Sequence, residues 1–495
     1  MLVWIILYNF ASMISDEWRY HIEHSLPFAP TTGQREAVGV VSQFLASPAS
    51  CVMILRGYAG TGKTSVARAV VAALRTMRRK TVLLAPTGRA AKVLQAGTGE
   101  AAYTIHRKIY RQQAYMSANF SLNDNLHSDT LFIVDEASMI SRHGNLQGSG
   151  GFGSGSLLDD LMSYVAHGTR CGLMLIGDTA QLPPVGSETS PALSADIIRG
   201  YGMAVFEYDL REVLRQSQSS GILYNATMLR DIIGRDTANH LPRISLNGFS
   251  DISVCRGDEL IETLASAYSR SGQDETIVIT RSNKRANVYN LGIRNQVLWR
   301  EEELTSGDQL MIVKNNYFWT NDKAGGSASH DASPAFLANG DRCIVRRVRN
   351  TQEVYGFRFA DVSLLFPDYD DYELDATVLL DTLHSEAPSL SPDQQEALYN
   401  RVMEDYADVR LKAERLKLLR ADRFFNALQV KYAYAVTCHK AQGGQWCEVF
   451  LDQGYVTEDM LSPSYIRWLY TAFTRATKHL HLVNWSKEQT ASGEE

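Results

Sequence analysis

The stretch Gly57-Tyr58-Ala59-Gly60-Thr61-Gly62-Lys63-Thr64 fits the pattern G-x-x-x-x-G-K-T. The apolar run 51–55 precedes it as a predicted buried strand, and residues 65–77, rich in good helix formers, follow it. Glycines let backbone N–H groups curl around a phosphate, and a helix N-terminus adds partial positive charge. A chance match would not explain a strand, a loop and a helix in this order. The stretch therefore predicts a nucleoside-triphosphate site in an α/β domain.

Three downstream residues complete a predicted hydrolysis site. Lys63 is placed to reach the β- and γ-phosphates, and Thr64 to hold Mg²⁺. Asp135 and Glu136 follow the apolar run 131–134, so Asp135 suits Mg²⁺ and Glu136 suits deprotonation of the attacking water. Gln181, after the run 172–176, is placed to sense the γ-phosphate or that water. The alternatives are a solvated acidic turn and a plain proline-containing turn.

Length and composition limit the classes of protein. A chain of 495 residues is too long for one core, so three or four domains are expected. Charged residues make up 21% and the net charge is −6, so positive potential for nucleic acid must be confined to a groove. The six cysteines are scattered without a C-x-x-C pair, which disfavours metal binding and a disulfide framework and fits a reducing cytoplasm.

The first eleven residues are strongly apolar but lack a preceding basic residue. A signal peptide or membrane anchor is therefore disfavoured. Two interpretations stay open: a short strand or helix packed on the core, or an over-long start of the reading frame. We expect a cytoplasmic protein without a membrane partner.

The apolar pattern divides the chain into two α/β units and an excursion. Residues 30–205 alternate strands with helical segments, which predicts a parallel sheet covered on both faces. A second unit begins near Val205. The predicted strands are 51–55, 81–85, 131–134 and 172–176 in the first unit, and 277–280, 432–436 and 479–483 in the second.

The excursion, about 301–430, is β-like at first and then helical. Segments 309–313, 341–349 and 354–365 predict a small barrel. Residues 391–428 predict helices, with Ser391 as N-cap and Pro392 in the first turn. Residues 107–130 break the first unit's pattern and suggest a small hairpin, and the Gly/Ser-rich stretch 144–156 predicts a mobile loop.

Four motifs together resemble motifs I, II, III and V of superfamily 1 helicases. They are the phosphate loop, Asp135-Glu136-Ala137-Ser138, the G-D-x-x-Q-L-P-P-V stretch at 177–185, and His439-Lys440-Ala441-Gln442-Gly443. Leu182-Pro183-Pro184-Val185 and the 439–443 motif resemble the 5′→3′ branch, the RecD-like and Dda-like enzymes. The resemblance covers about 30–300 and 430–483.

The resemblance implies an α/β fold with two RecA-like parallel-sheet domains, a hairpin insertion in the first and an SH3-like β-barrel insertion in the second. The implied boundaries are 1–26 for an N-terminal extension, 27–204 for the first domain with a wedge-like insertion at 107–130, 205–300 with 430–487 for the second domain, and 301–429 for the barrel with its helical extension.

The resemblance also assigns the nucleotide site. Gln34, in Thr32-Gly33-Gln34, matches the adenine-reading position, and Arg215 and Arg475 match arginines that reach the γ-phosphate. The implied ATP-binding residues are Gln34, Gly60, Thr61, Gly62, Lys63, Thr64, Ser65 and Gly443, with Mg²⁺ on Thr64 and Asp135. The implied catalytic residues are Lys63, Thr64, Asp135, Glu136, Gln181, Arg215 and Arg475.

The implied DNA contacts come from both domains: Pro86, Thr87, Thr104, His106, Phe120, Thr280, Asn283, Thr437, His439 and Lys440. Thr87 could also be a helix N-cap. Phe120, Tyr110 or Tyr115 could stack on a base or pack under its own hairpin. Because His439 belongs to this motif, we reject a nucleophilic Cys438–His439 pair.

The function implied by the resemblance is that of an ATP- and Mg²⁺-dependent DNA helicase. It would translocate 5′→3′ on single-stranded DNA and unwind duplex DNA as a monomer in replication, recombination or repair. The implied partners are single-stranded and forked duplex DNA, with single-stranded-DNA-binding or repair proteins. The alternative is an ATP-switched single-stranded-DNA clamp or remodelling subunit without strand separation. A small-molecule P-loop kinase would leave 430–483 unexplained. The direction of movement rests on the resemblance.

Overall fold

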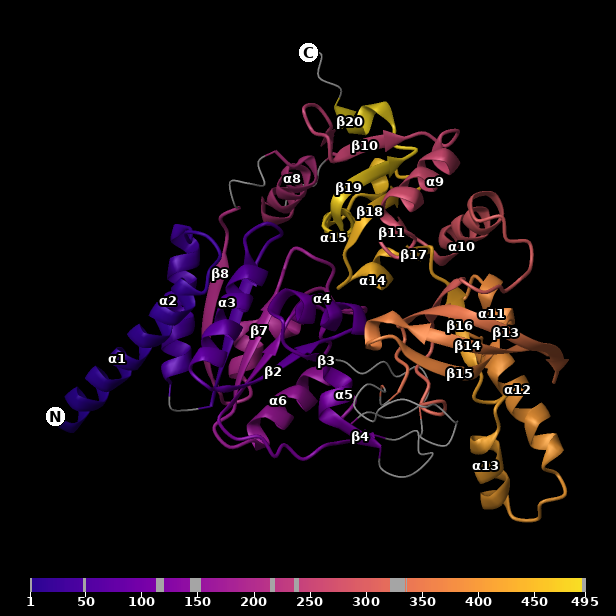
Figure 1. The fold of residues 1–495 in the computed structure, drawn as a ribbon, viewed down its shortest axis with the longest axis horizontal. Helices are drawn as coiled ribbons and strands as arrows, with labels where there is room; N and C mark the ends of the chain where they lie inside the picture. Colours follow the sequence, from indigo (N-terminus) through magenta and orange to yellow (C-terminus); the bar gives the residue numbers. More distant parts are fainter. Residues whose placement is uncertain are drawn as a thin grey trace.

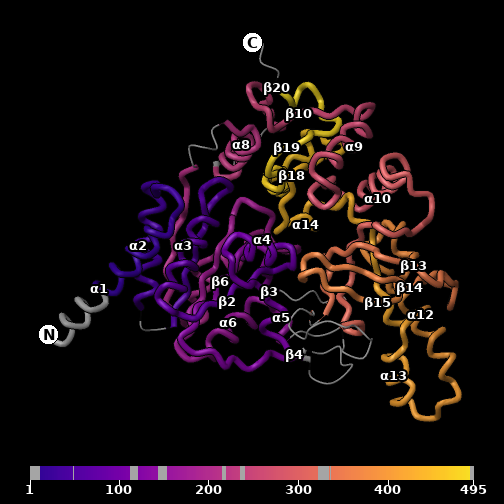
Figure 2. Tube along the Cα trace, in the orientation of Figure 1, coloured from indigo at the N-terminus to yellow at the C-terminus, as the bar shows by residue number. Residues whose placement is uncertain are grey.

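The chain folds into two parallel β-sheets and a closed β-barrel (Figure 1). The computed structural model describes residues 2–47, 50–112, 120–142, 153–213, 219–235, 240–320, 334 and 336–491, without the side chains of 2–11, 112, 120, 235 and 491. In Figure 2 the indigo-to-magenta part holds the first sheet, the orange part the barrel, and the yellow strands belong to the second sheet.

The first sheet has six parallel strands in the order β3-β2-β6-β7-β1-β8. They are β1 (Cys51–Gly57), β2 (Lys80–Ala85), β3 (Ala102–Thr104), β6 (Thr130–Val134), β7 (Gly172–Gly177) and β8 (Ala204–Leu210). Alternate side chains of β1 enter different cores, since Val52 and Ile54 pack on one face and Met53 and Leu55 on the other. The four strands predicted for this unit, and its parallel sheet with two covered faces, are confirmed.

Helices cover both faces of this sheet. Helices α1, α2 and α3 pack on one face, and α5, α6 and α7 on the other. The helices of this domain are α1 (Leu2–His24), α2 (Thr32–Ala46), α3 (Lys63–Thr76), α4 (Gly88–Thr98), α5 (Ile105–Ile109), α6 (Leu157–His167) and α7 (Ala195–Arg199). The predicted helix after the phosphate loop is α3.

The position of β8 corrects the predicted start of the second unit near Val205. This strand pairs in parallel with β1, from Cys51↔Ala204 to Gly57↔Leu210, so it is the edge strand of the first sheet. Arg56 of β1 forms ion pairs with Glu207 at 2.6 Å and Asp209 at 2.5 Å. Glu207 and Asp209 are therefore partners of one arginine on the neighbouring strand, a contact between distant segments.

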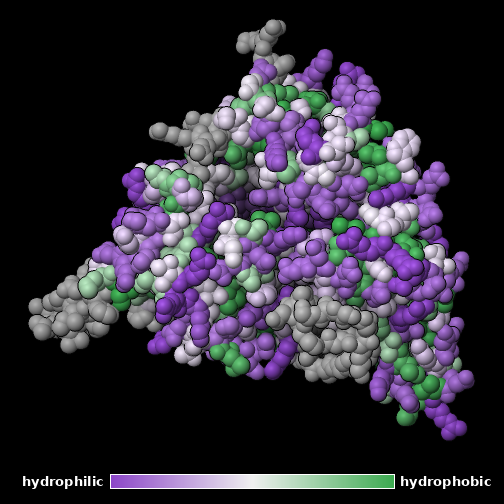
Figure 3. Space-filling model, in the orientation of Figure 1, coloured by the Kyte–Doolittle hydropathy of each residue, from purple (hydrophilic) through white to green (hydrophobic). Residues whose placement is uncertain are grey.

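The N-terminal stretch forms the helix α1. Farther along this helix, Trp18 and Ile22 are buried in one core with α2 and α3. The side chains of the first eleven residues lie outside the described part of the structure, so a packing of that stretch on the core stays a prediction. Within the described ranges, no helix combines the length and the apolar character needed to cross a bilayer. The face of the molecule seen in Figure 3 is mainly hydrophilic, with hydrophobic side chains in small scattered patches.

The second sheet has five parallel strands in the order β10-β19-β18-β11-β17. They are β10 (Ile252–Cys255), β11 (Thr276–Thr280), β17 (Ala435–Thr437), β18 (Trp446–Asp452) and β19 (Ala476–Val483). The helices around it are α8 (Gly221–Arg235), α9 (Leu260–Ser271), α10 (Asn283–Gly292), α14 (Cys438–Ala441) and α15 (Pro463–Phe473), and β9 (Ile244–Ser245) pairs with β20 (Thr490–Ala491). The predicted strands 277–280 and 479–483 are confirmed.

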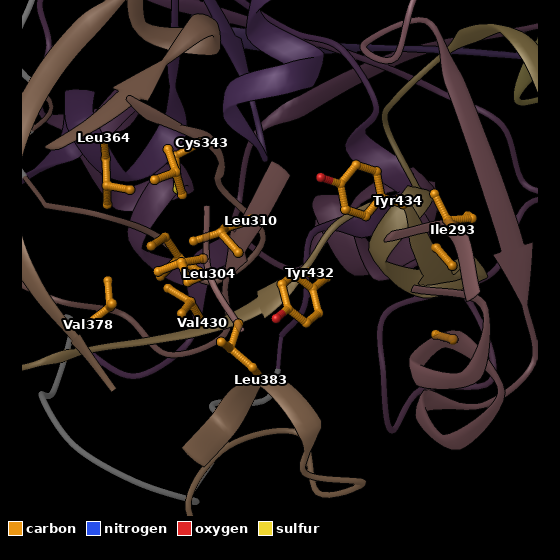
Figure 4. Close-up of a cluster of buried hydrophobic side chains, with 14 of the residues drawn as sticks. Ile293, Leu304, Leu310, Cys343, Leu364, Val378, Leu383, Val430, Tyr432 and Tyr434 are labelled. Atoms are coloured by element: carbon orange, nitrogen blue, oxygen red, sulfur yellow. The ribbon is translucent and has the colours of Figure 1, made fainter. Parts of the chain in front are cut away.

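The barrel is closed by five strands in the order β12-β13-β14-β15-β16. They are β12 (Gln309–Ile312), β13 (Arg342–Val354), β14 (Phe357–Phe366), β15 (Tyr372–Leu379) and β16 (Leu428–Tyr432). Figure 4 shows Leu310, Cys343, Val378 and Val430 inside it. A small barrel between the two parts of the second unit is therefore confirmed.

The predicted strand 432–436 is wrong as a single element. The chain leaves the barrel at Tyr432 and enters the second sheet at Ala435, so the apolar run contains the end of β16 and the start of β17. Tyr432 and Tyr434 lie in one hydrophobic cluster that is shared by barrel and sheet (Figure 4). A continuous apolar run cannot reveal such a change of partner.

Smaller elements complete the two insertions. Strands β4 (Tyr110–Gln112) and β5 (Phe120–Leu122) pair antiparallel, as the predicted hairpin requires, and Tyr115 between them lies outside the described residues. The helical extension contains α11 (Asp381–His384), α12 (Pro392–Asp405) and α13 (Lys412–Ala421). Ser391 caps α12 in a capping box with Gln394, which confirms the predicted helix start.

Candidate nucleotide site and nucleic-acid interface

The predicted hydrolysis residues meet at one edge of the first sheet. Strands β6, β7 and β1 are neighbours, and each is followed by one of the motifs. The phosphate loop follows β1, Asp135 and Glu136 follow β6, and Asp178 to Gln181 follow β7. Because ligands of open parallel sheets bind at the carboxyl ends of the strands, this edge is the candidate nucleotide site.

The phosphate loop has the backbone shape that its glycines allow. Gly60 and Gly62 have φ values of 76° and 84°, and a Cβ atom on Gly57 would lie 2.8 Å from Thr61 Oγ1. Lys63 Nζ donates hydrogen bonds to Gly57 O at 2.5 Å and Tyr58 O at 2.8 Å. A triphosphate in the loop would take the lysine from these carbonyls, so Lys63 fits the predicted phosphate contact.

The acidic pair suits a divalent cation. Burial, together with the neighbouring Glu136, raises the pKa of the Asp135 carboxyl. Glu136 N donates to Asp135 Oδ1 at 2.9 Å, and Glu136 has a left-handed φ of 52°. A buried carboxylate whose pKa is raised further by a neighbouring acidic side chain favours a bound cation such as Mg²⁺. Asp135 and Thr64 are the residues that would hold it.

Gln181 offers an acceptor toward the same edge. The residue is buried, and its Oε1 atom has no hydrogen-bond partner within the described ranges. A buried acceptor of this kind calls for a water molecule or a ligand donor. The observation fits the predicted contact of Gln181 with the attacking water.

Arg475 joins the second sheet domain to this site. It is buried just after α15, where Nε donates to Thr471 O at 3.0 Å and Nη1 to Gly444 O at 3.0 Å. Nη1 also lies 3.9 Å from Glu136 Oε1. The guanidinium is thus held by its own domain and directed at the acidic pair of the other. Arg215, the second predicted arginine, lies outside the described residues.

Three residues of α15 for which the sequence predicted no contact also reach the first domain. Arg467 donates to Thr179 O, and Thr471 Oγ1 accepts from Leu182 N at 2.8 Å. Tyr470 binds both Asp178 and the phosphate loop. Each of the four residues, counting Arg475 just after the helix, lies three or four positions from another of them, and all four therefore lie on one face. Once Arg475 is assigned to the site, this spacing could have pointed to the other three.

Two predicted nucleotide contacts have other neighbours in the structure. Gln34 is 1% exposed: its Oε1 accepts from Thr31 N in a capping box, and its Nε2 donates to Thr61 O at 3.3 Å. One amide hydrogen and one lone pair remain for a base. A Cβ atom on Gly443, which has a φ of 78°, would lie 3.3 Å from Thr87 Oγ1, so this glycine faces α4 of the first domain.

The predicted DNA contacts of the first domain lie beside the barrel. Thr87 caps α4 through Ala90 N, so its N-cap role is confirmed, and Thr104 caps α5. These elements line one small pocket, whose walls are Pro86, Thr104, His106 and Arg107 on one side and Pro334, Phe336, Ala338 and Tyr369 on the other. Burial lowers the pKa of His106 to about 4, so the imidazole is neutral at pH 7. The contribution of the barrel side was not predicted, because it depends on a contact between distant segments.

The predicted contacts of the second domain cluster at a matching sheet edge. Thr280 and Thr437 are register partners at the ends of β11 and β17. The Thr280 hydroxyl is buried and donates to Ser282 O at 3.1 Å, whereas Asn283 begins α10. Phe120 begins β5, and its side chain lies outside the described residues.

The motif that follows β17 presents two basic side chains. His439 is exposed, and Lys440 donates to Asn339 of the barrel segment. Burial lowers the pKa of Lys440 to about 8. Burial also raises the pKa of Cys438 to about 12, which agrees with the rejection of a Cys438 nucleophile.

Two family models match the chain. Residues 30–236 match the AAA domain, and residues 432–483 match the UvrD-like helicase C-terminal domain. The ATP-dependent RecD2 DNA helicase of Deinococcus radiodurans is 34% identical over 138 residues, which are 27% of this chain and 16% of that relative. Over the matched residues the chain is similar to this RecD2 DNA helicase. It thus spans about a sixth of the RecD2 chain's length.

Solved structures with similarity to this chain include Pif1 helicases. A Pif1 helicase from Bacteroides in complex with ADP-AlF3 and ssDNA is 13% identical, with 94% of this chain and 95% of that chain covered and a TM-score of 0.45. Pif1 helicase from Candida albicans is 17% identical, with 94% and 97% covered and a TM-score of 0.38.

Proposed function

We propose that the chain is an ATP-dependent DNA helicase that translocates 5′→3′ on single-stranded DNA and unwinds duplex DNA. The observation that carries the proposal is the approach of Arg475 from the second sheet domain to Glu136 of the first, at 3.9 Å. An arginine supplied across a cleft is suited to stabilising charge on a transferring phosphoryl group. Turnover would then depend on how the two domains sit, which is what a motor requires.

Each polar group at the sheet edge has a task in this proposal. ATP supplies the phosphoanhydride whose hydrolysis drives the cycle, with Mg²⁺ on Thr64 and Asp135. Lys63 leaves the carbonyls of Gly57 and Tyr58 to bind phosphate oxygens. Glu136 accepts a proton from water while Gln181 Oε1 accepts that water's hydrogen bond. Arg475 offsets negative charge.

The single DNA strand would lie across both sheets, at the carboxyl ends of their β-strands. Thr87 and Thr104, at the N-termini of α4 and α5, and Thr437 with Lys440 in the second domain would hold its phosphates without reading sequence. The hairpin of β4 and β5 would act as the wedge at a fork. The chain would act as a monomer, with single-stranded-DNA-binding or repair proteins as partners.

The test compares two forked duplexes, one with a 5′ single-stranded tail and one with a 3′ tail. ATP-dependent separation of the 5′-tailed fork alone, with ATP hydrolysis stimulated by single-stranded DNA, is the expected result. Separation of the 3′-tailed fork alone overturns the direction. DNA-stimulated hydrolysis without separation of either fork favours the clamp. Hydrolysis that survives Lys63→Ala overturns the assigned site.

A further inference from the structure

One phenol links three segments around the candidate nucleotide site. Tyr470 lies on α15, and 1% of the residue is exposed. Its hydroxyl accepts a hydrogen bond from Ala59 N of the phosphate loop at 2.8 Å and donates one to Asp178 Oδ2 at 2.6 Å. The Tyr470 hydroxyl oxygen of the second domain is thus hydrogen-bonded both to the loop after β1 and to the loop after β7.

The partners of the Tyr470 hydroxyl fix the direction of both of its hydrogen bonds. Asp178 is fully buried, its other oxygen accepts from Ala180 N at 2.9 Å, and Lys63 Nζ lies 3.8 Å from Oδ2. Burial and this carboxylate hold the Tyr470 pKa well above its usual value, so the phenol stays protonated. Its one hydrogen therefore goes to Asp178, and its lone pair receives the Ala59 amide.

The neighbouring contacts of α15 differ from this one. Arg467 and Thr471 bind the segment after β7, at Thr179 O and Leu182 N. Of these three side chains, Tyr470 alone is bonded to the phosphate loop in the described part of the chain. Beside the apolar packing of Tyr58 and Ala59 against the core of the second domain, this hydroxyl gives the phosphate loop a hydrogen bond to α15.

We propose that Tyr470 is a positioning residue that competes with the triphosphate for the phosphate loop. Its hydroxyl ties Ala59 to Asp178 and holds α15 against the loop in the absence of nucleotide. Phosphate oxygens claim the loop amides on binding, and because the Ala59 amide has one hydrogen, it leaves the phenol. Release of this bond removes the hydrogen bond of α15 to the loop, while the bonds of Arg467 and Thr471 to the segment after β7 remain. The inference rests on the proposed function only in placing a triphosphate here.

The experiment measures the affinity of a slowly hydrolysed ATP analogue with Mg²⁺ by calorimetry, without DNA. Tyr470→Phe keeps the ring and removes the competing oxygen. The matched control is Tyr465→Phe on the same helix, whose buried hydroxyl donates to Gln453 Oε1 at 2.7 Å within the second domain. We expect Tyr470→Phe to bind about fivefold tighter, as loss of one hydrogen bond implies, and the control to match the unmodified chain. Equal or weaker binding by Tyr470→Phe overturns the proposal.

Hydrogen exchange of segment 57–64 gives a second readout. We expect faster exchange in Tyr470→Phe than in the control without nucleotide, and equal protection in both once the analogue is bound. If Tyr470→Phe does not fold, the unmodified chain decides: a freely exchanging Ala59 amide without nucleotide overturns the proposal, and a protected one supports it. Failure of the proposed helicase function would appear elsewhere, as hydrolysis by the unmodified chain that single-stranded DNA does not stimulate.

Discussion

The Arg475 guanidinium and the Glu136 carboxylate lie 3.9 Å apart, although one follows α15 and the other follows β6. The two residues are 339 positions apart in the chain (475 − 136). The base and the charge-stabilising group of the proposed reaction therefore belong to different sheets. We expect relative displacement of the sheets to change this distance and, with it, the rate of the proposed hydrolysis.

Arg475→Lys tests the group that crosses the cleft. A lysine cannot reproduce the planar fork that holds Gly444 O and Thr471 O and faces Glu136. We expect kcat for ATP to fall by about 10³-fold. Arg294→Lys, which disturbs a buried arginine paired with Asp308 at 2.9 Å, should lower the melting temperature without a comparable loss of kcat. Unchanged turnover in Arg475→Lys would exclude the proposed role.

Glu136→Gln separates binding from hydrolysis. The amide keeps the size of the side chain but cannot accept the proton from water, so kcat should fall by roughly 10²–10⁴-fold. Nucleotide affinity, measured by calorimetry, should stay within about threefold, because Lys63 and the loop amides are intact. Glu207→Gln, on β8 away from the acidic pair, is the control. Loss of binding together with turnover would assign Glu136 a structural task instead.

Gln34→Ala tests the predicted adenine contact against a purely local role. The capping box should make the change cost about 1 kcal/mol of unfolding free energy. Gln394→Ala removes the corresponding partner in the capping box of α12 and should cost a similar amount. If Gln34 also reads the base, only Gln34→Ala raises the KM for ATP relative to GTP. Parallel effects of the two changes on stability, with unaltered nucleotide preference, would refute the base contact.

Asp341 predicts a pH dependence of stability. Burial raises its pKa to about 7, with Asp368 adding to the rise while the Ala338 amide, the Tyr369 hydroxyl and Lys440 oppose it. Between about pH 4 and 7 the folded chain keeps a proton that the unfolded chain releases, so stability falls as pH rises through this window. Asp341→Asn should remove this fall and raise the urea midpoint at pH 8, at about 1.4 kcal/mol per pKa unit.

The exposed Asp375 supplies the control for this measurement, because Asp375→Asn lies on the same barrel and should leave the pH profile unaltered. A profile of Asp341→Asn that still falls between pH 4 and 7 would show that another group is responsible.

Lys440→Met tests the charge offered to DNA. Loss of one phosphate contact should weaken single-stranded-DNA binding for all sequences and reduce the slope of log K against log salt by about 0.7. Because the Lys440 pKa is lowered to about 8, the affinity of the unmodified chain should fall as pH rises past 8. Lys80→Met, at the amino end of β2, lies at the opposite sheet edge and should leave the slope unchanged. Equal salt slopes for Lys440→Met and Lys80→Met would show that the DNA strand does not contact Lys440.

The local sequence pattern was sufficient to predict the fold where a strand, a motif and a helix follow one another. The run 51–55 with its glycine-rich loop predicts β1 and the start of α3 because both depend on neighbouring residues. It was insufficient where the partner is distant. The boundary near Val205 was misplaced because β8 pairs with β1, and that pairing, with the ion pairs of Glu207 and Asp209 to Arg56, joins segments about 150 residues apart. The apolar run 432–436 gave no sign that the chain passes from the barrel to the second sheet, because both have apolar cores.

Some residues of the candidate site could likewise be predicted from the local sequence, and others could not. Lys63, Asp135, Glu136 and Gln181 were predictable because each follows a buried strand within its own unit. Tyr470 was not, since a tyrosine in an apolar helix is ordinarily a core residue and its two partners become visible only in three dimensions. The barrel wall opposite His106 was hidden for the same reason.

Only Ala433 and Tyr434 separate β16 of the barrel from β17 of the second sheet, and Tyr434 is buried and bonded to Asp308 at 2.9 Å. Because two residues leave little room for independent rotation, we expect a rotation of the second sheet to carry the adjoining side of the barrel with it. The barrel also contacts α4 of the first domain, through Lys92 Nζ to Pro367 O at 2.9 Å. A displacement near Arg475 would therefore be passed through the barrel to a helix on the opposite side of the cleft.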